Sequence, residues 1–235
     1  MEPFDHKTEF TLTQPPHPDW TPPHSQKLPH PFSKDRETFV KSSDLSAGEM
    51  YKMLISSVVP RPIALVSTCS KDNTGAPVNI APFSYFNLVC HDPPTLMVSI
   101  NYSRGNQKTP SETFRRQHFV ESANHTSIPV PYEIEEDKLS GLTLVPSTYI
   151  KPKRVQESLV SFECRLSHCH LIQNAKGETS TGVVFGEVLG FTVKDGVWDP
   201  ETKQIDMRLY KPVSRLGGNN YGRTESGYEI MRPTI

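Results

Sequence analysis

A short segment near residue 80 combines small, polar and aromatic side chains. It reads Asn79-Ile-Ala-Pro-Phe-Ser84, and Ser67 and Thr68 close the apolar run before it. Pro82 lacks a backbone N–H, so it must end regular strand pairing or lie at a sheet edge or bulge. Unpaired backbone amides beside small residues, amides and hydroxyls suit a flat heterocycle rich in hydrogen-bond acceptors. The segment therefore indicates a ligand site at the end of a sheet.

A second group of candidate residues lies in the polar segment 101–117. It mixes cationic side chains with hydroxyls, and such a mixture holds a phosphate through charge-assisted hydrogen bonds. Composition alone slightly favours the alternative, a solvated basic loop. The cations are Arg104, Lys108, Arg115 and Arg116, and the hydroxyls belong to Ser103, Thr109, Ser111 and Thr113.

Other site chemistries find little support. Cys164, His168, Cys169 and His170 are close in sequence, but neighbouring strand residues point to opposite faces, so Cys169 cannot join the two histidines without distortion. There is no Gly-x-Gly-x-x-Gly after a strand, no Walker loop and no Gly-x-Ser-x-Gly elbow. We therefore expect no metal, no Rossmann or P-loop nucleotide site and no serine-hydrolase centre.

Composition bounds the function class. The 235 residues carry a net charge of -1, which gives no reason to expect nucleic acid or an anionic membrane as a partner. No apolar run approaches the roughly 20 residues that cross a bilayer, and the N-terminus lacks the features of a secretory signal. The four cysteines form no Cys-x-x-Cys pair. We expect a soluble cytoplasmic protein.

The N-terminal region is rich in proline. Residues 1–40 are predicted to be an extended or disordered arm, and residues 41–235 to form one domain. For the arm, a solvated tail is favoured over a strap on a partner subunit. Trp20 and Phe32 would anchor the arm if it docks.

Hydrophobic patterning predicts mainly strands. One short helix should follow a capping box at Ser46-Ala-Gly-Glu49 and end before Pro60. The predicted strands are Ile63–Thr68 and Ala76–Ile80 as a hairpin, then Thr95–Asn101, His118–Ser122, and a second hairpin of Val160–Gln173 and Thr179–Val193. The segment Leu209–Arg223 is expected to be irregular.

The second hairpin carries two further expectations. Alternation should place Phe162, Cys164, Leu166, His168 and His170 on a core-facing side of the first strand. In the second strand, glycines at positions 182, 186 and 190 should mark a bulge or the close approach of a ligand.

Taken together and in order, eight segments resemble the flavin reductase-like family of FMN-binding split barrels. They are PRPIALVST (60–68), VNIAPFSYFN (78–87), DPPTLMVSI (92–100), ANHTSIP (123–129), SGLTLVPS (140–147), ESLVSFECRL (157–166), VVFGEV (183–188) and RLGG-x-x-Y (215–221). The resemblance covers residues 45 to 223. It implies an all-β dominated fold, a six-stranded antiparallel Greek-key split barrel with a few short helices, usually a homodimer with FMN at the subunit interface.

The resemblance also implies site residues. Ser67 and Thr68 match the flavin-edge positions, and Arg104 matches a phosphate contact that continues either in Lys108-Thr109 or in Ser111-Glu112-Thr113. The residues matching the segment that lines the isoalloxazine ring are Asn79, Ala81, Pro82, Phe83 and Ser84. Thr181 stands where the family often has histidine, and the stretch from Thr113 to Ala123 is shorter than in family members.

Two function hypotheses follow from the resemblance. The first is an NAD(P)H-dependent flavin reductase, a flavoprotein oxidoreductase in which hydride passes from the nicotinamide to flavin N5 without a catalytic acid or base residue. The alternative is a non-enzymatic FMN-binding or assembly module that has lost turnover. It rests on the short stretch from Thr113 to Ala123 and on the residues after Arg104 that do not match the family's phosphate contacts.

Overall fold

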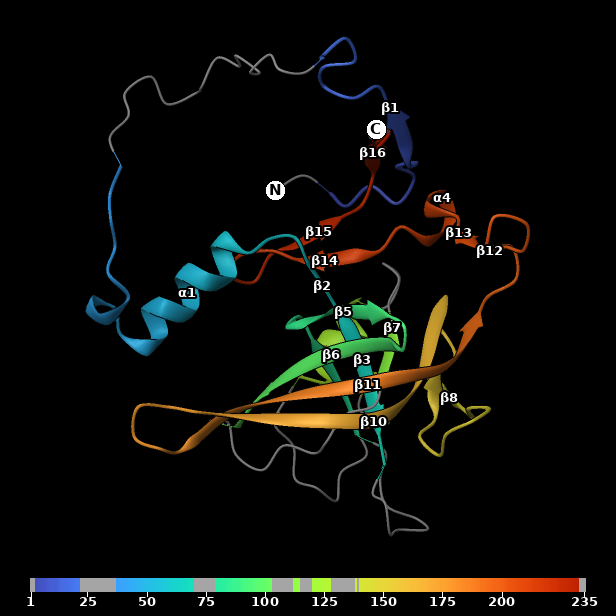
Figure 1. Ribbon diagram of the computed structural model, residues 1–235. Helices are drawn as coiled ribbons and strands as arrows, with labels where there is room; N and C mark the ends of the chain where they lie inside the picture. Colours follow the sequence, from blue (N-terminus) through green and yellow to red (C-terminus); the bar gives the residue numbers. More distant parts are fainter. Residues whose placement is uncertain are drawn as a thin grey trace.

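The computed structural model describes most of the chain, and strands dominate it (Figure 1). The described residues are 3–21, 37–69, 79–102, 120–127, 138 and 140–232, with the backbone of 112–114. The strand-rich fold predicted from the sequence is confirmed for this part of the chain.

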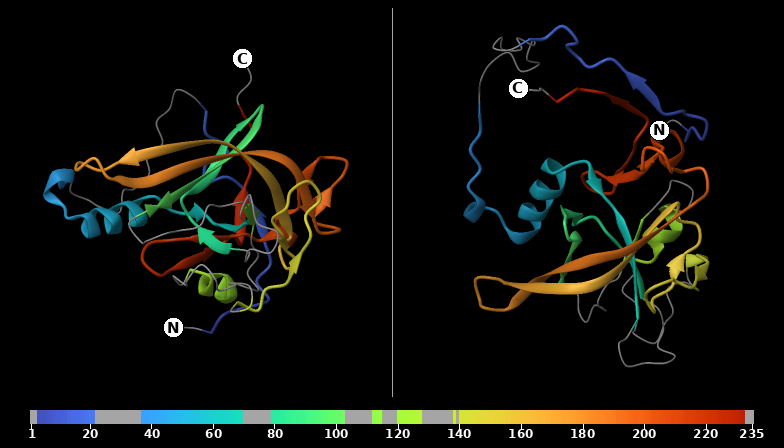
Figure 2. Two further views of the ribbon diagram at one scale, coloured as in Figure 1. Left: turned by 90° about the horizontal axis from the view of Figure 1, so that it is seen from below. Right: turned by 45° about the vertical axis from the view of Figure 1, so that its right-hand side comes forward.

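The larger sheet is antiparallel, with strand order β10-β11-β6-β5. Its strands are β5 (Phe86–His91), β6 (Pro94–Asn101), β10 (Val160–Gln173) and β11 (Thr179–Val193). β10 and β11 are the predicted second hairpin, and their far end extends beyond the other strands in both views of Figure 2. Only residues 181–187 of β11 pair with β6, so the rest of the hairpin leaves the sheet as a two-stranded ribbon.

The second sheet has the order β4-β3-β7, with β3 (Ala64–Thr68) between β4 (Asn79–Phe83) and β7 (Glu112–Phe114). β3 and β4 form the predicted first hairpin, but β4 extends three residues past the predicted end at Ile80, and residues 70–78 lie outside the described residues. β4 continues past Pro82 because it is an edge strand of this sheet. There a missing N–H costs no ladder bond when the ring nitrogen faces away from β3.

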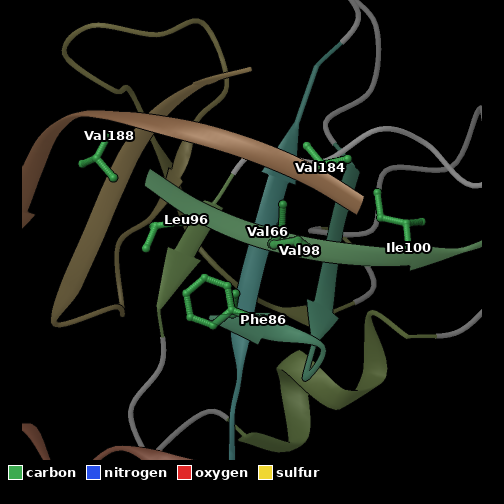
Figure 3. Close-up of a cluster of buried hydrophobic side chains, with 8 residues drawn as sticks. Val66, Phe86, Leu96, Val98, Ile100, Val184 and Val188 are labelled. Atoms are coloured by element: carbon green, nitrogen blue, oxygen red, sulfur yellow. The ribbon is translucent and has the colours of Figure 1, made fainter. Parts of the chain in front are cut away.

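The two sheets enclose an apolar core (Figure 3). Ala64 and Val66 of β3 pack there against side chains of the larger sheet. These are Phe86, Leu96, Val98, Ile100, Val184 and Val188. Leu65 points to the opposite face of β3 and is fully buried in a second cluster, with Ile80, Ala123, Leu142 and Val155. β3 is thus covered on both faces, and all of its residues are buried.

Shorter paired strands surround these sheets. β14 (Val213–Arg215) pairs with β2 (Arg61–Pro62) and β15 (Tyr221–Arg223), β8 (Leu144–Val145) with β9 (Arg154–Val155), and β12 (Trp198–Asp199) with β13 (Gln204–Ile205). The expectation of an irregular segment at 209–223 is therefore wrong in part. A tight turn joins β14 to β15, and the segment also includes the end of the short helix α4 (Met207–Tyr210).

The first residues of the chain dock onto its own C-terminal segment. β1 (Thr11–Thr13) pairs in parallel with β16 (Ser226–Tyr228), and Lys211 Nζ donates to the carbonyl of Thr8 at 2.8 Å. The solvated-tail interpretation is therefore wrong for this part of the arm. Phe32 lies outside the described residues, and the domain boundary at residue 40 stays a prediction.

Helix α1 (Ala47–Ser57) begins at the predicted capping box and follows a 3-10 turn at Ser42–Asp44. Ser46 Oγ accepts the N–H of Glu49, whose carboxylate accepts the N–H of Ser46 at 2.9 Å.

No helix in the described ranges is both long and apolar enough to span a bilayer.

The local structure differs from the sequence analysis at three further points. The predicted strand at His118–Ser122 is wrong, because its described residues open helix α2 (Val120–His125), which buries Ala123 against the Leu65 cluster. Tertiary packing overrides the β-branched pattern there. Strand β5 was not expected from the sequence. Most of its residues are exposed on both faces of the strand, so it lacks the alternation of apolar and polar residues that indicates a half-buried strand.

The third point concerns β10. Leu166, His168 and His170 are exposed, because β10 is the edge strand of the larger sheet and only Phe162 and Cys164 of it pack against the core between the sheets. A register shift between Leu166 and His168 also breaks the expected alternation. Ser161 and Glu163, which were expected on the opposite, polar side, are buried instead.

The capping box gives a first testable prediction. Ser46→Ala removes the side-chain acceptor at the start of α1 and should lower the free energy of unfolding by about 0.5–2 kcal/mol, measured by urea denaturation. Ser43→Ala is the matched control. Within the described residues, its hydroxyl donates only to the neighbouring, exposed Asp44, so a change within about 0.5 kcal/mol is expected. Equal losses in the two variants would contradict the role of the cap.

Candidate functional site

The predicted sheet end is the β3–β4 hairpin. Thr68 and Asn79 face each other across it and are buried, whereas 81–84 are half-buried along the outer side of β4. β4 thus begins at a buried polar pair, Thr68 and Asn79, and continues as a half-buried edge strand. Such an edge leaves backbone groups within reach of a ligand.

Strand geometry divides the predicted residues between two faces. Residues directly opposite in an antiparallel pair share a face, so Thr68 and Asn79 lie on the face of Val66. Ser67 and Pro82 lie on the opposite face, which belongs to Leu65. A flat ligand meets residues of both faces only when it lies along the edge of β4.

Ser67 is tied to a neighbouring loop. Its Oγ donates to the carbonyl oxygen of Lys153 at 2.7 Å, and its side chain is 3% exposed. The loop, which we call the 146–153 loop, is closed internally by Ser147 Oγ donating to the carbonyl of Pro152 at 2.5 Å. The hydroxyl hydrogen of Ser67 is therefore engaged within the protein, and its oxygen remains available as an acceptor.

The buried carboxylate of Glu163 in β10 also holds the 146–153 loop. It accepts the N–H of Thr148 at 2.8 Å and the N–H of Tyr149 at 2.6 Å. The ring of Tyr149 lies over Gly190, where an added Cβ would come within 3.0 Å of it. The expected close approach at this glycine is therefore made by the chain's own aromatic ring, and β3, β10 and β11 together position the 146–153 loop.

Ser84 lies beside a buried arginine. Arg61 Nε is 3.4 Å from Ser84 Oγ, and the guanidinium donates to the carbonyls of Ile55 (2.6 Å), Val58 (2.7 Å) and Leu216 (3.0 Å). Carbonyls at the C-terminal end of a helix carry partial negative charge, so the end of α1 offsets part of this buried positive charge. Arg61 thereby fixes the end of β4 relative to α1 and to the β14–β15 turn.

The β4 segment offers no group that exchanges protons near neutral pH. Residues 79–89 contain no Asp, Glu, His or Lys. Burial raises the pKa of Tyr85 above its usual value, with a further upward contribution from Tyr51 that the charge of Arg61 opposes. Tyr85 therefore keeps its proton, and the segment is suited to binding and orientation rather than to acid–base chemistry.

Most of the predicted phosphate-binding residues are not covered. Ser103, Arg104, Lys108, Thr109 and Ser111 lie outside the described residues. Thr113 is described only through its backbone, which pairs with Leu65 as part of β7. Its strand therefore runs along the edge of β3 opposite to β4.

Two other kinds of site were searched for in the described part of the chain: a metal site and a cleft. No group of three or more His, Cys, Asp or Glu in these ranges could hold a metal ion. An open cleft of about 710 Å³ lies elsewhere, and its lining includes Glu157, Lys194 and Leu209 but none of the predicted site residues.

Comparison with known proteins decides the family. Residues 55–202 match the family model described as the flavin reductase like domain. An uncharacterized protein of Halalkalibacterium halodurans is 35% identical over 204 residues, covering 81% of this chain and 94% of that protein. An uncharacterized Bacillus subtilis protein is 34% identical, covering 83% and 98%. The chain belongs to the flavin reductase-like family.

Solved structures support this flavin reductase-like fold. Nitrilotriacetate monooxygenase component B from Bacillus cereus superposes with a TM-score of 0.77 at 26% identity, covering 84% of this chain and all of that one. The 2-nitrobenzoate 2-nitroreductase of Pseudomonas fluorescens gives a TM-score of 0.72 at 27% identity, covering 84% and 98%. The predicted split-barrel class is confirmed, and the family places the chain among flavin-related oxidoreductases.

The residues present fit a flavin. The half-buried edge of β4 combines small side chains with backbone groups, and buried hydroxyl and amide groups stand at its inner end. That set of donors suits the acceptor-rich edge of an isoalloxazine ring. Sequence reasoning missed Arg61 and Glu163, although both are charged residues inside otherwise apolar segments, which is the signal that could have found them.

Glu163 gives the second testable prediction. Glu163→Ala removes the acceptor of the Thr148 and Tyr149 amides and should lower the free energy of unfolding by about 1–3 kcal/mol in urea denaturation. Glu187→Ala is the control, because Glu187 makes a surface ion pair with Arg165 and should cost less than about 1 kcal/mol. An effect no larger than that of the control would show that Glu163 does not hold the loop.

Proposed function

We propose that this protein is an NAD(P)H-dependent oxidoreductase that binds FMN along the edge of β4. The observation that carries the proposal is the β3–β4 hairpin. Its buried polar residues Thr68 and Asn79, and the half-buried stretch of β4 around Pro82, belong to the segments that resemble the flavin site of the family. When bound, FMN supplies the hydride-accepting N5 position. The chain needs to bind and orient it, and to give the nicotinamide access to one face.

The described residues divide these tasks. Thr68 and Asn79 present a hydroxyl and an amide at the inner end of the β4 edge. Ser84 presents a second hydroxyl at the outer end, where Arg61 holds it in place. Because hydride transfer to flavin requires no protein acid or base, the lack of a titrating group in residues 79–89 agrees with this function.

Cytoplasmic location and a homodimer complete the proposal. Large apolar side chains are exposed on the four-stranded sheet, among them Leu88 (64%), Leu166 (60%) and Phe191 (63%). Exposed apolar surface of this kind is typical of a protein interface. Light scattering coupled to gel filtration should therefore give twice the chain mass, and a monomer at micromolar concentration would contradict this part of the proposal.

The first functional test is direct. Purified protein titrated with FMN should retain flavin with its visible absorbance, and it should consume NADH or NADPH with free flavin faster than a blank. No flavin spectrum and no retention of added FMN would reject the proposal.

The second candidate function is a binding module without turnover. It is favoured by the short connection between β7 and α2, because residues 115–119 alone join Phe114 to Val120. FMN binding without any consumption of NADH or NADPH would support this candidate, and steady turnover would exclude it.

A residue-level test concerns Arg104, which the resemblance assigns to the FMN phosphate. Losing a charge-assisted hydrogen bond costs on the order of 1.5–3 kcal/mol, so Arg104→Ala should weaken FMN binding roughly ten- to a hundred-fold. Riboflavin, which lacks the phosphate, should be nearly unaffected. Equal losses for the two flavins would show that the substitution damages the fold and not the phosphate contact, and no loss for either would remove Arg104 from the phosphate site.

A further inference from the structure

Three cationic side chains follow one another closely at the end of the 146–153 loop. Lys151 and Lys153 are exposed and Arg154 is half-buried, and residues 142–154 contain no Asp or Glu. None of the three takes part in an ion pair within the described residues. The chain as a whole has a net charge of -1, so this segment is a local concentration of positive charge.

The backbone that carries these cations is held in place. Lys153 is anchored through its carbonyl to Ser67, and Arg154 belongs to β9, which pairs with β8. The acid that touches this loop, Glu163, is buried, and both its oxygens already accept backbone N–H groups of the loop. Its charge is thus directed inward, and the cationic groups stay available to a ligand on a preorganised support.

The anchor also locates the segment. Ser67 lies in β3, one residue from Thr68 at the inner end of the flavin-binding edge. Because the Oγ of Ser67 contacts the carbonyl of Lys153, the basic segment is attached to the face of β3 opposite to Thr68, beside the proposed flavin-binding edge rather than on it.

We propose that Lys151, Lys153 and Arg154 bind a phosphate group of the nicotinamide nucleotide and favour NADPH over NADH. This inference rests on the proposed function. The 2′-phosphate of NADPH is a dianion that NADH lacks, and a guanidinium with neighbouring ammonium groups binds such a group by charge-assisted hydrogen bonds. The 2′-phosphate is carried by the adenosine ribose, away from the nicotinamide, so its site is expected beside the flavin and not in contact with it. The FMN phosphate has a separate basic segment in the sequence, which begins at Arg104.

The test uses the full-length protein and two nucleotide fragments. Adenosine 2′,5′-bisphosphate carries the 2′-phosphate and 5′-AMP does not, so calorimetric titration of both isolates the contribution of that phosphate. The wild type should bind the bisphosphate about tenfold more tightly, and this preference should shrink as salt is raised. The double variant Lys153→Ala, Arg154→Ala should lose the preference while keeping its affinity for 5′-AMP.

Two control variants sharpen the test. Arg154→Lys keeps the charge but loses the planar fork, so it should retain part of the preference. Lys176→Ala removes an exposed cation from the β10–β11 turn and should leave the preference unchanged. With FMN present, the ratio of kcat/KM for NADPH to that for NADH should fall about tenfold in the double variant.

Several results would overturn the inference. They are equal wild-type affinity for the two fragments, a double variant that keeps the preference, and a double variant that loses both ligands equally. A double variant that binds FMN more weakly but riboflavin normally, with the bisphosphate unaffected, would assign the segment to FMN instead. Since the fragment titrations involve no flavin, they succeed or fail independently of the flavin reduction assay.

Discussion

The structure depends on the burial of β3 from both faces. Ala64 and Val66 pack into the core between the sheets, and Leu65 packs into the second cluster on the opposite face of β3. A strand covered on both sides has no freedom to shift register, because a slip of one residue would exchange the residues of the two cores. β3 therefore fixes its partner β4 on one edge and β7 on the other.

The candidate site follows from this constraint. β4 has β3 on one side only, so its outer edge can accept a ligand while its inner edge is held rigidly. Ser67 extends the same support to the 146–153 loop, and Glu163 holds that loop from the larger sheet. The proposed flavin-binding edge and the proposed nucleotide-binding segment are thus attached to one buried strand, and their separation is set by the core.

Sequence patterning predicted those elements in which local signals and tertiary packing agree. The capping box at Ser46, both hairpins and the alternation of Leu96, Val98 and Ile100 in β6 are of this kind. It failed where long-range contacts decide. Ala123 is helical because it packs against Leu65, and Leu166 is exposed because β10 is the edge strand of the larger sheet. Neither fact is present in the neighbouring sequence.

The candidate site could be proposed from the sequence through its family resemblance more than through its chemistry. Residues 79–84 carry an ordinary mixture of side chains, and their importance depends on an edge position that only the fold provides. Arg61 and Glu163 act on backbone groups that are distant in sequence, such as the Leu216 carbonyl and the Thr148 amide. Such contacts leave no periodic pattern, so they became visible only in the structure.

Hydrogen–deuterium exchange with and without FMN tests the central claim, that flavin lies along the edge of β4. Backbone amides of residues 79–86 should exchange more slowly with FMN present, whereas the β1–β16 pair and the cleft near Leu209 should not change. Unchanged exchange in residues 79–86 at saturating FMN, or protection confined to the cleft, would contradict the account.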